Sequence, residues 1–147
     1  MAIWCEVIEQ LRDFIRAAAI VKFVEGGALN PEDFNLAAED GKTGAIFLIR
    51  DREVGESLLK NSGGQMVFFV ENWVYSDDVD PLEGYRVLAA QEAAFKELLK
   101  NWVYERAAQD NSFDILDVSL EETIGDADSR RPYLGSRMSV TLQWSLI

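Results

Sequence analysis

Three carboxylates, Asp77, Asp78 and Asp80, lie close together in the chain and could bind a hard cation such as Ca²⁺. A calcium-binding loop also needs a glycine at its sharp turn and a terminal glutamate at a fixed offset, and neither is present at that spacing. Asp80 directly precedes Pro81, and Glu83 follows at the position that a capping box requires, a pattern typical of a helix start. We therefore predict a capped helix and a solvated turn, with no metal site.

The chain has no histidine, which excludes Ser-His-Asp and Cys-His catalysis and the usual zinc sites. The glycine pairs at 26–27 and 63–64 lack the spacing of phosphate-binding and dinucleotide-binding loops. The sequence therefore predicts a protein that is not an enzyme and uses no cofactor. A histidine-free enzyme that works with carboxylates is the last of the alternatives.

Arg130 and Arg131 stand beside Tyr133 in a polar stretch, residues 125–136, which is long for a hairpin connection. Arginine and tyrosine are over-represented among the residues that dominate the binding energy of protein interfaces. Two interpretations are open: a solvated hairpin tip, or a contact in which the arginines meet the acidic surface of a second copy. We predict Arg130, Arg131, Tyr133 and Arg137 as protein-interface residues.

The charge of the chain restricts its partners. A net charge of −12 disfavours binding to DNA, RNA or anionic membranes, because these contacts need clustered lysine and arginine. No apolar run approaches the length of a membrane span, and we expect no signal peptide. The single cysteine, Cys5, cannot form an intramolecular disulfide, and its place on an apolar helix face predicts that it is buried.

Apolar periodicity predicts two helices, at residues 3–19 and 81–108. Strands are predicted at 45–50, 65–75, 113–124 and 137–147, while residues 20–25 form either a short strand or an extended helix end. In the last strand Met138, Val140, Leu142, Trp144 and Leu146 point one way, and Leu142 and Trp144 should be buried. In the strand at 113–124, the residues Leu116, Val118, Leu120 and Ile124 are expected to share a face.

The strand at 65–75 is apolar on both faces, so it needs cover on both. Helices should provide one cover, and a loop or a neighbouring subunit the other. At 147 residues the chain fits one domain, residues 1–147. We predict an α+β two-layer sandwich: a mainly antiparallel sheet of about four to five strands, with both long helices on one face.

The order of these elements resembles that of the tail terminator and minor tail proteins of long-tailed bacteriophages, including prophage-encoded forms. The resemblance covers nearly the whole chain. Its final part contains an Arg-Pro-Tyr segment at 131–133, a Leu-Gly-Ser segment at 134–136, and the alternating strand at 137–147. The early helix, the strand at 65–75 and the helix that starts after Asp80 fit the same layout.

The resemblance implies a structural protein that forms a ring, often of six copies, on the end of the tail tube. Such a ring stops tube polymerisation and offers a surface to the head connector, and a head–tail joining role is closely related. The implied partners are further copies of the chain, the tail tube protein and a head-completion or connector protein. The implied location is the virion tail, and the host cytoplasm during assembly. No individual family residues are carried over.

An alternative is a small ligand-binding or regulatory α+β module of non-viral bacterial origin. In that case Trp73, Trp102 and Trp144 would line an apolar pocket. Tryptophans at this spacing are more often part of a core than of a pocket.

Overall fold

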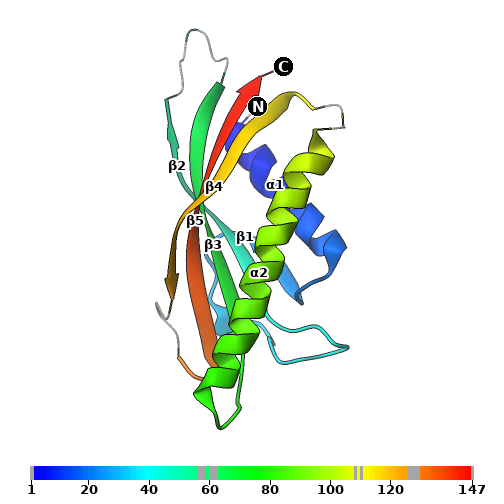
Figure 1. Cartoon of the computed structure of the whole chain (residues 1–147), viewed down its shortest axis with the longest axis vertical. Helices are drawn as coiled ribbons and strands as arrows, with labels where there is room; N and C mark the ends of the chain where they lie inside the picture. Colours follow the sequence, from blue (N-terminus) through cyan, green and yellow to red (C-terminus); the bar gives the residue numbers. More distant parts are fainter. Residues whose placement is uncertain are drawn as a thin grey trace.

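A computed structural model of the chain places two helices against one five-stranded sheet (Figure 1). It describes residues 2–55, 59, 63–107, 109, 111–125 and 130–146. In chain order the elements are α1 (Ile3–Ala18), β1 (Phe23–Gly26), a short 3₁₀ helix (Pro31–Asp33), β2 (Ala45–Val54), β3 (Gly63–Tyr75), α2 (Pro81–Arg106), β4 (Phe113–Gly125) and β5 (Tyr133–Leu146).

The strands form one open sheet in the order β1-β2-β3-β5-β4. β1 is parallel to β2, and the other neighbouring pairs are antiparallel. The predicted α+β class and mainly antiparallel sheet are confirmed. β1 resolves the alternative left for residues 20–25, because a strand forms there rather than a helix end. β2 also continues past the predicted end at residue 50, to Val54.

Both helices pack on the same face of the sheet (Figure 1). Their buried stripes meet the alternate residues of the three central strands in one apolar cluster. The cluster includes Leu11 and Ile15 of α1, Phe95, Leu99 and Trp102 of α2, Leu48 of β2, Phe68 of β3, and Val140, Leu142 and Trp144 of β5. The predicted burial of Leu142 and Trp144 is confirmed. Among the described helices, none combines the length and the apolar character needed to cross a membrane.

A second, smaller cluster lies on the opposite face of the sheet, where Trp73 and Phe47 are buried. The segment at 28–44 covers them, and the Phe34 ring lies 5.5 Å from that of Phe47. Gly135 lies opposite Trp73 in the sheet, and a Cβ there would come within 2.6 Å of the Trp73 ring. A loop, one of the two covers that the sequence analysis left open, thus covers the Trp73 end of this face of β3. Farther along the strand, Phe69 is half-buried beneath Arg137.

Two β-bulges interrupt β4 and change which of its side chains face the core. Its pairing with β5 skips Leu116 and shifts again after Leu120. Because each extra residue reverses the alternation, Val118 and Leu120 pack toward the helices while Ile124 lies on the opposite face. The prediction that Leu116, Val118, Leu120 and Ile124 share a face is therefore wrong.

Asp80 caps α2, as the sequence predicts: its Oδ1 accepts a hydrogen bond from the Leu82 N–H at 3.1 Å. The Asp80 N–H itself donates to Asp78 Oδ1 at 2.9 Å. Glu83 instead forms an ion pair with Arg86. The capping box predicted for Glu83 does not form, because Asp78 already satisfies the backbone N–H that Glu83 would have bound.

The buried stripe of α1 consists of Val7, Leu11 and Ile15. Cys5 is exposed, so the prediction that it is buried is wrong. The reason is angular: at 3.6 residues per turn, a residue two positions before Val7 lies about 200° away around the helix. The apolar spacing of the first helix identified the element correctly, but it did not fix the centre of the buried face.

β5 begins at Tyr133, so Tyr133 lies on a strand and not in the loop predicted for residues 125–136. Arg130 and Tyr133 exchange two backbone hydrogen bonds, of 2.9 and 2.7 Å, which close a tight turn just before the strand. Residues 126–129 of the predicted loop, and residue 108 at the predicted end of the second helix, lie outside the described residues.

Candidate interaction surface

Arg137, the most C-terminal of the predicted interface residues, is held within the protein by two contacts. Its Nη2 and Nε atoms lie 2.6 and 3.2 Å from Glu71 Oε2, across the β3–β5 pair. Its guanidinium also stacks 4.8 Å from the centre of the Phe69 ring. These contacts are on the sheet face away from the helices. Arg137 therefore orders that face, and its charge is neutralised by Glu71.

Arg131 and Tyr133 also make internal contacts. Arg131 Nη2 donates a hydrogen bond to the Asp78 carbonyl, which ties the turn before β5 to the segment before α2. The Tyr133 ring meets the Tyr75 ring edge to face, with centroids 5.8 Å apart. Both residues therefore fix one corner of the sheet.

Arg130 is the member of the predicted set that projects freely. It is exposed, and its guanidinium has no ion-pair or hydrogen-bond partner among the described residues. It lines an open hollow of about 390 Å³ with Trp73, Tyr133 and the segment 28–32. The structure thus brings Arg130, Arg131 and Tyr133 to one corner, but leaves Arg130 as the cation available to a partner.

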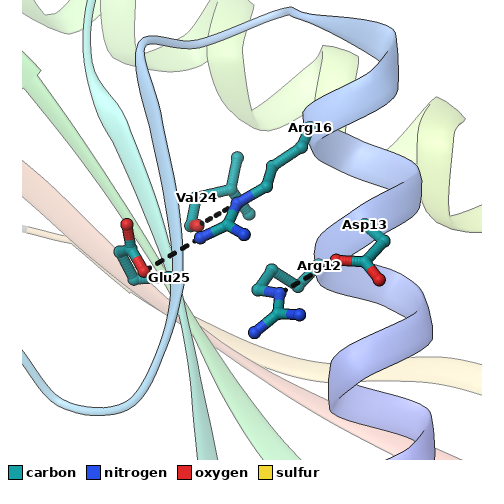
Figure 2. Close-up of polar contacts among 5 residues, drawn as sticks. All are labelled: Arg12, Asp13, Arg16, Val24 and Glu25. Atoms are coloured by element: carbon teal, nitrogen blue, oxygen red, sulfur yellow. Dashed lines mark hydrogen bonds and ion pairs between the residues drawn. The ribbon is translucent and has the colours of Figure 1, made fainter.

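The β1 edge of the sheet is closed by a side chain from α1. Arg16 Nε donates to the Val24 carbonyl of β1 at 2.8 Å, and Arg16 Nη2 pairs with Glu25 at 3.0 Å (Figure 2). The Arg16 side chain occupies the space beside the Val24 carbonyl where an added strand would lie, so this contact protects an edge that is only four residues long. The sequence analysis did not predict that Arg16 protects this edge. Its partner is a backbone carbonyl, and every residue has one, so the residue types alone do not reveal the contact.

The opposite edge is formed by β4, a strand of 13 residues that pairs with β5 alone. Two features limit simple strand addition there: the bulges, and the exposed carboxylates of Asp114, Asp117 and Glu122. These carboxylates are in register with Ser145, Gln143 and Ser139, so they lie on the sheet face away from the helices. On the helix side β4 contributes the apolar side chains of Val118 and Leu120, whereas its other side is acidic.

Arg106 fixes the start of β4. Its Nη1 donates to the Phe113 carbonyl at 3.2 Å, its Nη2 and Nε donate to Gln10 Oε1 of α1 at 3.3 and 3.4 Å, and its guanidinium stacks over the Phe113 ring. Burial lowers the pKa of Arg106, and the nearby Asp114 carboxylate opposes that shift. One buried cation thus joins α1, the end of α2 and β4.

A groove of about 520 Å³ separates the C-terminal half of α2 from the middle of β4. α2 packs mainly on β3 and β5, which leaves the helix-side surface of β4 partly uncovered. Leu99, Val103, Val118 and Leu120 provide apolar surface in the groove, and its other lining residues are Lys96, Lys100, Tyr104, Leu116, Asp117 and Ser119. Tyr104 and Leu116 are 69% and 64% exposed, so part of the exposed apolar surface of the described residues gathers at this groove.

The sequence analysis did not single out Lys96 and Lys100. Their spacing of four residues, on the helix that carries Leu99, is a signal that could have placed them beside an apolar strip. The spacing of the two lysines could not show that β4, rather than solvent, lies across the groove from them.

The three tryptophans of the ligand-binding alternative do not meet. Trp102 and Trp144 belong to the main cluster between the helices and the sheet. Trp73 is in the second cluster, on the opposite face. A single pocket lined by all three would have to pass through the sheet.

In the described ranges, no group of three or more Asp, Glu or Cys side chains is arranged to hold a metal ion. Asp78 and Asp80 each accept a backbone hydrogen bond at the start of α2. We expect Ca²⁺, Mg²⁺ or Zn²⁺ to leave the melting temperature unchanged, because a cation that bound the native state alone would raise it. Thermal denaturation followed by circular dichroism, with an EDTA-treated reference, measures this. A saturable rise that Asp77→Asn abolishes would contradict the prediction.

Comparison with known proteins gives no match for this chain, either to a protein-family model or to a curated protein sequence. The resemblance to phage tail proteins therefore rests on the order of the elements and on the segment at 131–147. The surfaces available for assembly are the two sheet edges, the groove between α2 and β4, and the exposed Arg130.

Proposed function

We propose that this chain is a structural subunit that assembles into a ring in the tail of a bacterial virus, as a tail terminator or head–tail joining protein. The observation that carries the assembly part is the contrast between the two sheet edges. Arg16 closes the β1 edge, whereas the β4 edge is long and borders an open apolar groove. The viral part is supported by the element order on which the resemblance rests.

Two unlike edges favour a ring over a two-fold dimer. A two-fold dimer uses the same patch on both copies, whereas a head-to-tail contact joins two different patches and closes into a ring when the rotation allows. Each copy carries a charge of −12, so copies repel one another at low salt. Ring formation is therefore expected to need added salt, a high protein concentration or the tail tube as a template.

The experiment that tests this proposal adds the purified chain to polymerising tail tube protein from the same genome. Tubes should stop growing at the capped end, and electron microscopy should show a ring of one size on it. Tail-tube and tape-measure genes should lie near the gene. Unchanged tube growth together with failure to bind the head connector would remove the viral proposal, and so would a genome that holds no tail genes.

Arg130→Glu should reduce the joining of heads to tails, or the control of tail length, because it reverses the cation left free at the sheet corner. Its free energy of unfolding should change by about 0.5 kcal/mol or less, since Arg130 is an exposed turn residue. Counting joined virions and measuring tail lengths by electron microscopy gives the effect.

Lys42→Glu is the matched control for this variant. Lys42 is another exposed cation without an ion pair in the described residues, and it lies in a different turn. Arg131→Glu is unsuitable, because it also removes the hydrogen bond to the Asp78 carbonyl. Normal virions from Arg130→Glu would exclude this corner from the interface.

A further inference from the structure

We infer that the groove between α2 and β4 receives the acidic loop at residues 77–80 of a neighbouring copy. This inference deepens the proposed function and rests on it in one respect, that the chain associates with itself. Every copy carries both the groove and the loop, and the two are complementary in charge and in apolar character.

The groove is the cationic, apolar partner in this contact. Lys96 and Lys100 are exposed, lie one helical turn apart, and form no ion pair within the described part of a chain of charge −12. Leu99, Val118 and Leu120 supply apolar surface between the helix and the strand. Asp117 of β4 also lines the groove, so the lining carries two cations and one carboxylate and is positive on balance. A segment that carries an apolar side chain between carboxylates could bind here, with the apolar side chain on the leucines and valine and the carboxylates near the two lysines.

The acidic loop has that composition. Val79 is 93% exposed, which places an apolar side chain almost entirely in water, and Asp77, Asp78 and Asp80 surround it. Asp78 and Asp80 are fixed by hydrogen bonds at the start of α2, and the Arg131 contact to the Asp78 carbonyl holds the loop from the other side. The loop is thus already ordered before it docks, which lowers the entropic cost of binding.

The loop cannot reach the groove of its own chain. It precedes the N-terminus of α2, whereas the groove lines the C-terminal half of the same helix, and α2 is a rigid rod of 26 residues (Figure 1). Docking must therefore join two copies through unlike patches. Such a head-to-tail contact leaves a free loop at one end and a free groove at the other, which is the arrangement that closes into a ring.

Two variants separate the patches without touching the core. The loop variant carries Asp77→Lys and Val79→Lys, two exposed positions that take no part in the helix cap. The groove variant carries Lys96→Glu and Lys100→Glu. Each should raise the dissociation constant for self-association by about 100-fold, measured by sedimentation velocity over a concentration series, because charge reversal turns attraction into repulsion.

Mixing the two variants gives the decisive result. The loop variant keeps an intact groove and the groove variant keeps an intact loop, and the lysine loop of the first is also complementary in charge to the glutamate groove of the second. An equimolar mixture should therefore recover assembly, as a species in which the two variants alternate in equal numbers. Native mass spectrometry identifies this species by mass. Controls are Asp33→Lys and Lys42→Glu, which reverse exposed charges elsewhere and should assemble as the unchanged chain does.

Three outcomes overturn the inference. If both variants assemble normally, the contact uses other surfaces, although the ring proposal stands. If the variants fail alone and also when mixed, the two patches do not bind each other. If the unchanged chain stays monomeric at both low and high salt, and both variants form rings on tail tubes as the unchanged chain does, copies do not dock through this groove; capping of tail tubes still tests the proposed function separately.

Discussion

Phe68→Ala is expected to lower the free energy of unfolding by about 3–5 kcal/mol. Phe68 is fully buried on β3, the middle strand of the sheet, in the cluster where both helices meet the sheet. Truncation removes the transfer free energy of the ring and leaves a cavity between two layers that are anchored on several sides. Urea denaturation followed by circular dichroism measures the loss.

Tyr104→Ala is the matched control for this prediction. It also removes an aromatic ring, but from a side chain that is 69% exposed on α2. Its effect on the free energy of unfolding should be about 0.5 kcal/mol or less. Similar losses for the two variants would mean that the face of β3 toward the helices is not the core of the protein.

Gly44→Ala is the second large expected effect, a loss of about 2–5 kcal/mol. Gly44 has a φ of +81°, which costs an L-residue roughly 1–2 kcal/mol. A Cβ there would also lie 2.4 Å from Gln91 Oε1 and 2.7 Å from the Trp73 carbonyl oxygen, so about 1–3 kcal/mol of overpacking is added. The neighbouring Gln91 amide donates to the Ala45 carbonyl at 3.0 Å, and this buried contact would have to shift.

Gly41→Ala separates these two contributions. Gly41 has nearly the same φ, +79°, but no atom lies within 4 Å of the Cβ position. It should therefore lose only the conformational part, about 1–2 kcal/mol. Both losses of unfolding free energy are measured by chemical denaturation. Equal losses for Gly41→Ala and Gly44→Ala would show that α2 is not packed closely against the chain at Gly44.

Local signals in the sequence predicted the regular parts of this fold. The alternation at Met138, Val140, Leu142 and Trp144 identified the buried face of β5, because period two is a property of the strand itself. Asp80 identified the start of α2, since a cap is made within a few residues. These features depend on neighbours in sequence, so they are visible without the structure.

Features that depend on distant partners were missed. The bulge at Leu116 exists only in relation to the pairing with β5, and the alternation of β4 was therefore misread. The exposure of Cys5 depends on where α1 meets the sheet. The parallel pairing of β1 depends on a crossover that no local pattern encodes.

The candidate site was predicted in part. Composition identified Arg130, Arg131, Tyr133 and Arg137 as candidates, and three of them do share one corner. Composition could not show that Glu71, which lies 66 residues from Arg137 in the chain, already neutralises it. The groove between α2 and β4 was not predicted, because it depends on how far across the sheet the helix lies.

The place of β5 in the sheet has a consequence for the newly made chain. β5 is synthesised after the other four strands, yet it lies between β3 and β4 and joins them. Until β5 has emerged from the ribosome, β3 has one unpaired edge and the apolar residues of its helix side lack their neighbours in β5. The β1-β2-β3 part of the sheet can pair before this segment is translated, but β4 cannot join it until β5 is present. In that interval the open edge of β3 and its uncovered apolar residues are where the nascent chain is most exposed to aggregation.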